Sequence, residues 1–362
     1  MKNKLLLLLN NFNLGGAERM VFELANNVDT ERYDVEILCY GPRVDNFLSQ
    51  MVESKFGVTY LDISGGITVQ NIRKALKAIN LASPNIVHAH MGGAGFAAIW
   101  ALFHKDPVVI TVHTKPDKAF SPKIEKLIRL ALKRRSTTLV AVSEENLKKV
   151  NAYFGNASAK NRCVNNGITL SRFQQKTHSG FAMINVARQD ENKNQSAILR
   201  CFKKYLDHYP EDRLYLVGDG PCHEELVEMS MNLGLSENVV FTGNVENTED
   251  YYSVSDLYVQ SSHREAMPLS LLEAMAVPMP IISTNVGGIC DVVCGNGILV
   301  DDNDEPALLA AMLQVRGMNS EETNKLKERS LAIVADYSSE AMGKKYMELY
   351  DECINKNGKP KN

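Results

Sequence analysis

Residues 257–276 read LYVQSSHREAMPLSLLEAMA, an apolar run, a polar loop and a second apolar run in succession. Leu257–Gln260 has the length of a buried strand, and Leu269–Ala276 has the composition of a helix packed against a core. Pro268 is well placed to open that helix, because the N–H that proline lacks would be unpaired at a first helical position. The stretch therefore predicts one strand–loop–helix unit of a parallel α/β sheet.

The same alternation of short apolar runs and helix-period segments extends in both directions. Expected strands are 4–9, 35–39, 58–61, 86–90, 108–112 and 138–142, then 182–187, 213–217, 238–242, 257–260, 280–283 and 297–300. Expected helices are 17–27, 72–80, 95–103, 124–134, 195–208, 223–233, 269–276, 305–312 and 338–353. Short strands separated by helices indicate parallel sheets covered on both faces. The polar segment 165–179 is the expected linker, and 355–362 an expected frayed tail.

The chain of 362 residues exceeds what one core usually organises, which favours two domains. We predict an α/β protein with two doubly wound, Rossmann-like domains and a cleft between them. The domains are expected at residues 1–168 and 169–340, with a C-terminal helix and tail at 341–362 that packs back toward the first domain.

Composition narrows the class of protein. No apolar run approaches the roughly 20 residues that span a bilayer. The run Leu5–Leu9 is too short for a signal peptide and is followed by asparagines, so a buried strand and a cytoplasmic protein are expected. The seven cysteines include no CxxC pair, which favours free thiols over a disulfide framework or a zinc site. Residues 1–170 carry 22 Lys and Arg against 14 Asp and Glu, so an anionic partner is expected for this half.

Several polar groups are expected at the ends of strands. The N–H groups of Leu269 and Ser270 would face an anion at a helix N-terminus. Glu265 would lie before that helix and Glu273 about one turn inside it, where the two carboxylates could reach hydroxyl groups; two solvated glutamates are the alternative. Arg188 and Lys193 could grip phosphate, or could be surface charges.

Gly15 and Gly16 lack Cβ atoms, so their backbone could approach a phosphate closely, or could form a simple strand–helix turn. The absence of GxGxxG there argues against a dinucleotide-binding oxidoreductase.

The Glu265–Glu273 segment resembles the E-x7-E signature of the retaining glycosyltransferases of family 4, which have the GT-B fold. Further resemblances follow in the family's order from residue 14 to residue 300. They are Gly15–Glu18, Val87–His90, Val112–Thr114, Ala141–Glu144, Asn166–Ile168, Ala187-Arg188 with Lys193-Asn194, Gly218–Pro221 and Gly287-Gly288. The sequence departs from the family's pattern at Pro278, where a glycine is frequent, and at Asp291, where a glutamate is frequent.

The resemblance implies a retaining, metal-independent glycosyltransferase of the bacterial surface-polysaccharide type, which needs no cofactor. A nucleotide-sugar would be its donor and a glycan or lipid-linked saccharide its acceptor, bound on the side of the first domain. His113, Glu265, Arg188 and Lys193 are the expected catalytic residues; for His113 the alternative is a histidine that only caps its strand. Donor-binding residues are expected to be Gly15, Gly16, Arg188, Lys193, Asn244, Val245, Glu265, Met267, Pro268, Leu269, Ser270 and Glu273, with Gly243–Val245 lining the pocket for the base. A sugar-nucleotide epimerase of the same fold and a non-catalytic companion subunit are the alternatives.

The segment Lys118–Arg135 is basic and has apolar residues at helical spacing. Such a helix can dock on anionic lipid at the cytoplasmic face of the inner membrane, or can pack on the core with a solvated charged face. A nucleic-acid partner is not expected, because aromatic residues are not interleaved with the basic ones. His88 and His90 share one face of a strand, where a structural role or an acceptor contact is favoured over metal binding.

Overall fold

The computed structural model describes residues 2–134, 136–155 and 161–357. The chain divides into two compact units, one formed by Met1–Gly167 with Ser339–Asn362 and the other by Ile168–Ser338. The boundaries expected from the sequence, after residues 168 and 340, lie within two residues of these divisions.

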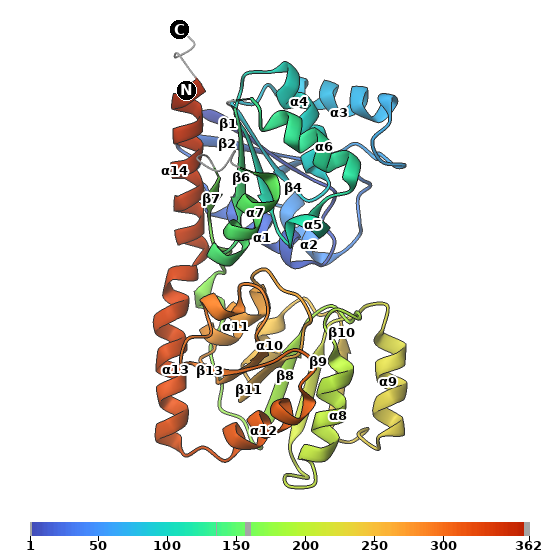
Figure 1. Ribbon diagram of the computed structural model, residues 1–362, viewed down its shortest axis with the longest axis vertical. Coiled ribbons are helices and arrows are strands. Elements are labelled where there is room, and N and C mark those ends of the chain that lie inside the picture. Colours follow the sequence, from blue (N-terminus) through green and yellow to red (C-terminus); the bar gives the residue numbers. More distant parts are fainter. Residues whose placement is uncertain (1, 135, 156–160, 358–362) are drawn as a thin grey trace. The chain divides into compact units, whose positions relative to one another are not determined.

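Figure 1 shows the sheet of unit 1. Its strands are parallel and follow the order β3-β2-β1-β4-β5-β6-β7. Its strands are β1 Asn3–Leu9, β2 Tyr33–Cys39, β3 Gly57–Tyr60, β4 Ile86–His90, β5 Val108–Val112, β6 Thr137–Ala141 and β7 Arg162–Cys163. The order reverses between β1 and β4, and the carboxyl ends of strands at such a reversal are where doubly wound sheets bind ligands.

Helices cover both faces of this sheet. Leu6, Leu8, Val87 and Ala89 form a core with the helices of one face, which are α3 Val69–Ala82, α4 Gly93–Phe103 and α6 Pro122–Ala131. The intervening residue His88 faces the opposite way, where it bonds to the C-terminal helix α14, Ser339–Asn357. Helix α14 packs beside α1, Gly16–Asn26. The remaining helices of unit 1 are α2 Phe47–Glu53, α5 Pro116–Ala119 and α7 Glu144–Phe154.

Unit 2 repeats the plan with a parallel sheet of order β10-β9-β8-β11-β12-β13. Its strands are β8 Ala182–Val186, β9 Arg213–Val217, β10 Val239–Gly243, β11 Leu257–Gln260, β12 Ile281–Thr284 and β13 Gly297–Val300. The order reverses between β8 and β11. Both sheets therefore have the parallel, doubly wound arrangement that the sequence predicts.

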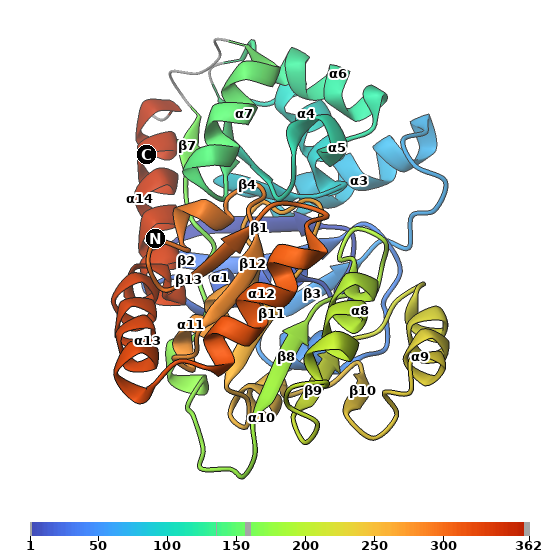
Figure 2. The same cartoon turned by 60° about the horizontal axis from the view of Figure 1, so that its bottom comes forward.

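The helices of unit 2 also form two layers. On one face lie α8 Gln195–Tyr205, α9 His223–Asn232 and α12 Glu305–Arg316, which share a core with Val259 (Figure 2). On the other face, α11 Leu269–Ala276 packs against α10 Thr248–Tyr252 and α13 Ser320–Val334. Three-residue 3-10 helices lie at Leu170–Arg172, Ile289–Asp291 and Ala335–Tyr337.

Helix α11 begins at Leu269 and ends at Ala276, as the sequence predicts, and Pro268 is its N-cap in extended conformation (φ −73°, ψ 128°) and not its first residue. Two other sequence predictions about local structure are wrong. Helix α6 ends at Ala131 and not at residue 134. Residues 355–357, expected to be frayed, continue α14; the rest of that tail lies outside the described residues.

Candidate functional site

The predicted polar residues of unit 2 gather at the reversal of its sheet. Lys193 lies in the loop after β8, and Glu265 lies in the loop after β11. Because β8 and β11 are adjacent parallel strands, their carboxyl ends meet at one edge of the sheet. This is the crevice in which open α/β sheets bind ligands.

Lys193 and Glu265 form an ion pair at this edge. The Lys193 Nζ lies 2.6 Å from Glu265 Oε1, and the Glu265 side chain is only 9% exposed. Gln260, at the end of β11, donates from Nε2 to the same carboxylate oxygen at 3.1 Å. The carboxylate is therefore held by two donors, one charged and one neutral.

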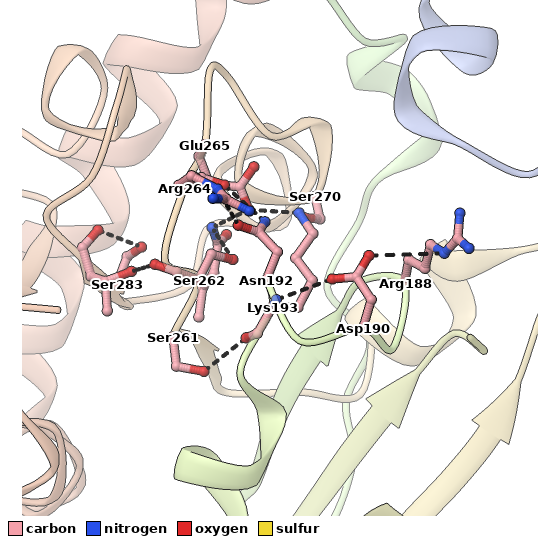
Figure 3. Close-up of polar contacts among 12 residues, drawn as sticks. Arg188, Asp190, Asn192, Lys193, Ser261, Ser262, Arg264, Glu265, Ser270 and Ser283 are labelled. Carbon is pink, nitrogen blue, oxygen red and sulfur yellow. Dashed lines mark hydrogen bonds and ion pairs between the residues drawn. The ribbon is translucent and has the colours of Figure 1, made fainter. Parts of the chain in front are cut away.

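Hydrogen bonds between the two loops fix the position of this pair (Figure 3). The Ser261 hydroxyl donates to the carbonyls of Lys193 (3.1 Å) and Asn194 (2.8 Å). Asn192 and Arg264 bond to each other twice: Asn192 Nδ2 donates to the Arg264 carbonyl at 3.0 Å, and Arg264 Nε donates to Asn192 Oδ1 at 3.2 Å. These contacts lock the β8 loop to the β11 loop, which limits the cost of ordering the site when a ligand binds.

Arg188 does not share the Lys193–Glu265 contact. Its side chain is 69% exposed, and its Nε lies 3.8 Å from Asp190. Figure 3 shows the guanidinium directed away from the pair. An exposed arginine with one weak ion pair is available to a soluble anion.

The N-terminus of α11 follows Glu265 directly. The N–H groups of Leu269 and Ser270, in the first turn, have no acceptor within the helix by its geometry. Met267 and Leu269 are buried, and the Ser270 hydroxyl lies 2.9 Å from Tyr258 Oη. Glu273 is half-buried further along the helix, beside Tyr252. Burial, followed by the Glu273 charge, raises the pKa of the Tyr252 hydroxyl.

Gly287 packs so closely against the Glu265 loop that no side chain fits at its position. Its φ is +62°, and a Cβ built there would lie 1.7 Å from the Glu265 carbonyl oxygen. Any side chain at this position would displace the Glu265 backbone. The paired glycines were a landmark in the sequence, but their contact with Glu265 could not be found from spacing.

Asn244 and Val245 follow β10 and lie in the loop before α10. The N–H of Gly218 donates to the Gly243 carbonyl at 3.0 Å, which ties this loop to the end of β9. Asn244 is exposed and Val245 is half-buried. Both lie at the same edge of the sheet as Lys193, because β10, β9 and β8 are neighbouring parallel strands.

The Gly15–Gly16 turn in unit 1 is occupied by a carboxylate of its own. Gly15 is the N-cap of α1 and Gly16 its first residue. A Cβ at Gly15 would lie 2.4 Å from Glu18 Oε2, so the Glu18 side chain folds back over the turn. A carboxylate is stabilised at a helix N-terminus, and it would repel a phosphate there. In this arrangement the Glu18 side chain occupies the space beside the turn.

His113 follows β5 and bonds to a second histidine. Its Nε2 lies 3.0 Å from His90 Nδ1, and burial lowers the pKa of His113 to about 4. His88 Nδ1 bonds to Tyr350 Oη of α14 at 2.6 Å, and His88 Nε2 bonds to Thr111 at 2.7 Å. The three histidines are thus neutral at pH 7, and His88 has the structural role favoured by the sequence.

The basic segment splits into two helices, α5 and α6, with Arg135 outside the described residues. The apolar side of α6, including Ile128 and Ala131, packs in the core of unit 1. Leu130 is 40% exposed, and five basic residues of the described part of the segment are exposed: Lys118, Lys123, Lys126, Lys133 and Arg134. The structure therefore favours, for the apolar residues of α6, the alternative in which they pack on the core. No helix of the described residues has both the length and the apolar character needed to cross a membrane.

Unit 2 alone thus brings together Lys193, Glu265 and the start of α11. Sequence reasoning missed Gln260 and Ser261, which lie inside the quoted stretch but carry no charge. The only sequence feature that could have identified them is a polar side chain at the end of a strand that is predicted to be buried.

Comparisons with known proteins agree with this architecture. Residues 168–331 match the family described as glycosyl transferases group 1, and residues 14–172 match the family described as glycosyltransferase family 4. An uncharacterised glycosyltransferase of Methanocaldococcus jannaschii is 26% identical over 258 residues, which are 64% of each chain. The chain thus spans less than two thirds of that relative.

A lipopolysaccharide core biosynthesis glycosyltransferase of Rhizobium meliloti, LpsD, is 27% identical over 189 residues, 50% of this chain and 52% of the relative. The crystal structure of Anabaena HepE in complex with UDP and glucose superposes with a TM-score of 0.82 at 18% identity, over 97% of this chain and 100% of that one. At this identity the likeness establishes a shared fold.

Proposed function

We propose that this chain, whose residues 14–172 and 168–331 match glycosyltransferase family 4 and glycosyl transferases group 1, transfers a sugar from a nucleotide-diphosphate sugar to an acceptor hydroxyl. The proposed reaction retains the anomeric configuration. The acceptor would be a glycan or a lipid-linked saccharide, and the pathway the synthesis of a surface polysaccharide. The name of the relative LpsD supports this acceptor class.

One observation carries the proposal: the Lys193–Glu265 pair lies at the reversal of the unit 2 sheet, directly before the N-terminus of α11. A helix N-terminus binds phosphate through free N–H groups and the positive end of its dipole. In this site the α11 N-terminus and Lys193 would hold the diphosphate, Glu265 would accept hydrogen bonds from sugar hydroxyls, and Glu273 would accept them from the ribose.

The proposed chemistry is electrostatic. As the glycosidic bond to phosphate breaks, negative charge develops on the diphosphate, and the cations of Lys193 and Arg188 stabilise it. Arg188 is exposed and weakly paired, so it can turn toward the phosphate at little cost. The phosphate leaving group takes the proton of the acceptor hydroxyl, and the acceptor oxygen forms the new bond to the anomeric carbon on the same face of the sugar. We propose that these two cations suffice and that no metal takes part.

The neutral state of His113 limits its part in the reaction. A histidine whose pKa is about 4 carries no charge at pH 7, so it cannot neutralise a phosphate. It can exchange a hydrogen bond with a sugar hydroxyl, and we assign it that role.

UDP is the proposed nucleotide, because HepE, which shares the fold, was crystallised with UDP and glucose. The test is a thermal-shift series with UDP, GDP and ADP on the purified protein. A ligand that binds only the folded state raises the apparent stability by about 2.7 kcal/mol when present at 100 times its Kd. We expect UDP to raise Tm and ADP to leave it unchanged. If no nucleoside diphosphate shifts Tm, the donor-site proposal is wrong.

Peripheral association with anionic membranes is a further part of the proposal. Arg134 donates to the carbonyl of Leu102 at 2.7 Å, next to Phe103, whose side chain is 74% exposed. An exposed aromatic residue beside basic residues suits a lipid–water interface, where each lysine or arginine contributes about 1 kcal/mol. Sedimentation with phosphatidylglycerol vesicles should be lost in the variant Lys133→Glu/Arg134→Glu, and should not occur with phosphatidylcholine vesicles. Equal sedimentation with both lipids would contradict the electrostatic basis.

A further inference from the structure

A chain of hydrogen bonds runs behind Glu265 through the interior of unit 2. The Ser270 hydroxyl lies 2.9 Å from Tyr258 Oη, and Tyr258 Oη lies 2.7 Å from Gln260 Oε1. Gln260 Nε2 then lies 3.1 Å from Glu265 Oε1. Tyr258 and Gln260 are buried, at 0% and 2% exposure. The chain therefore connects the first turn of α11 to the carboxylate without passing through solvent.

The chemistry of the groups fixes the direction of every bond in this chain. A carboxylate only accepts, so the side of the Gln260 amide that faces Glu265 must be the NH2 group. Its oxygen then faces Tyr258, which must donate its only proton to it. The oxygen of Tyr258 is left to accept from Ser270. Burial raises the pKa of Tyr258, so the hydroxyl keeps the proton that this arrangement requires.

The alternating directions of side chains along β11 explain why this series of hydrogen bonds can form. Tyr258 and Gln260 lie on the face of β11 that meets α11, whereas Val259 lies on the opposite face, in the core formed with α8 and α12. A polar residue at position 260 is expensive to bury unless all its groups are paired. Here Gln260 pairs on both sides, and its Nε2 also lies 3.3 Å from Ser262 Oγ.

The contacts also distinguish the two oxygens of Glu265. Lys193 and Gln260 both bond to Oε1, and no bond to Oε2 is found among the described residues. Two donors on one oxygen orient the carboxylate and leave the other oxygen for an incoming hydroxyl.

We infer that Gln260 is a positioning residue for the donor sugar, which fixes Glu265 so that Oε2 receives a sugar hydroxyl. The inference deepens the proposed function and rests on it. Gln260 itself would touch neither the nucleotide nor the sugar. Its removal should weaken binding of the sugar part of the donor and spare the nucleotide part.

Calorimetric titration of Gln260→Leu with UDP and with UDP-glucose tests this separation. We expect the affinity for UDP-glucose to fall by about 10- to 100-fold, as for the loss of a hydrogen bond to a charged group, while the affinity for UDP stays within about twofold. Val259→Ala is the matched control, since it perturbs the same buried strand on its other face and should change neither affinity. Equal losses for UDP and UDP-glucose in Gln260→Leu, or no loss for either, would overturn the inference.

A pH profile of transfer gives a signature that a purely structural glutamine would lack. In Gln260→Glu the introduced carboxyl repels Glu265 when ionised, but it can donate its proton to Glu265 when protonated. Its kcat/KM should therefore recover toward the wild-type value as pH falls, whereas the deficit of Gln260→Leu should be the same at every pH. A constant deficit in both variants would contradict the inference.

A stability measurement separates this inference from the proposed function, because it needs no ligand. Lys193 and Gln260 share one oxygen of Glu265, so their substitutions should not be independent. The Tm shift of Lys193→Met/Gln260→Leu should differ from the sum of the two single shifts. Additive shifts would overturn the positioning role. Non-additive shifts in a protein that binds neither UDP nor UDP-glucose would support the Gln260–Glu265 coupling and refute the proposed donor.

Discussion

Replacing Gly287 with alanine should displace the loop that carries Glu265. Two penalties act at this position. Its φ of +62° disfavours any residue with a Cβ, and the new Cβ would lie 1.7 Å from the Glu265 carbonyl oxygen, where real Cβ contacts stay beyond 3.0 Å. The backbone of one loop must therefore move by more than an ångström, which changes the position of the carboxylate.

Gly295 provides a control that separates the two penalties. Its φ is +82°, but a Cβ there would meet nothing within 4 Å. Gly295→Ala should lose about 1–2 kcal/mol, the cost of the left-handed conformation alone. Gly287→Ala adds the clash, for which overpacking costs of about 1–3 kcal/mol apply, so its total loss should be about 2–5 kcal/mol.

Urea unfolding gives the stability of both variants, and titration with UDP-glucose reports on the site. We expect Gly287→Ala to be less stable than Gly295→Ala and to bind UDP-glucose at least tenfold more weakly, because a misplaced Glu265 loses a hydrogen bond to the sugar of about 1.5–3 kcal/mol. If Gly287→Ala matched Gly295→Ala in both stability and affinity, the contact with Glu265 would not shape the site.

Three more predictions follow from the burial and contacts of particular side chains. Burial holds the pKa of His113 at about 4, below the ordinary 6.5, so the unfolded chain takes up its proton first and stability falls as pH drops from about 6.5 toward 4. One histidine shifted this far costs up to about 2 kcal/mol at pH 5, and urea titrations at pH 7 and pH 5 should show a smaller loss in His113→Asn. Tyr350→Phe should cost about 1–3 kcal/mol in the same titration, because it leaves the buried Nδ1 of His88 unpaired; an unchanged midpoint would refute that contact. Lys193→Ala should lower Tm because it leaves the buried Glu265 carboxylate without its cation, whereas Arg188→Ala, at an exposed side chain, should change the free energy of unfolding by less than about 0.5 kcal/mol. Both variants should nevertheless bind UDP more weakly than the wild type does. An unchanged affinity in either variant would show that this residue does not bind the phosphate.

Much of the fold could be predicted because buried parallel strands are nearly continuous apolar runs. Strands β4, β5, β9, β11 and β13 begin and end where the sequence predicts. Strand β7 has two residues, which is too short to give a pattern. Helix α13 was missed because most of it is exposed, with Ser330 and Val334 its buried residues, and it is stabilised at its start by a capping box between Asn319 and Glu322.

The charged residues of the candidate site could be predicted from the sequence, but the contacts between them could not. Lys193 and Glu265 were both expected there, but their ion pair could not be, because it depends on the strand order that places their two loops side by side. Arg188, expected to act with Lys193, is 69% exposed and is directed away from the Lys193–Glu265 pair. At Gly15 the sequence left a phosphate cradle and a simple strand–helix turn both open, and it did not indicate that the Glu18 side chain folds back over this turn. Side-chain direction within a loop is set by tertiary contacts, which spacing does not encode.

Product analysis of UDP-glucose incubated with the protein, with and without a saccharide acceptor, decides whether the unit 2 site transfers a sugar. In the presence of acceptor, we expect UDP to be released and an α-linked glycoside to form, and we expect both products to disappear in Glu265→Ala. A donor epimerised in the absence of acceptor would identify an isomerase. A product formed equally by Glu265→Ala would show that the site at the reversal of the unit 2 sheet is not where transfer occurs.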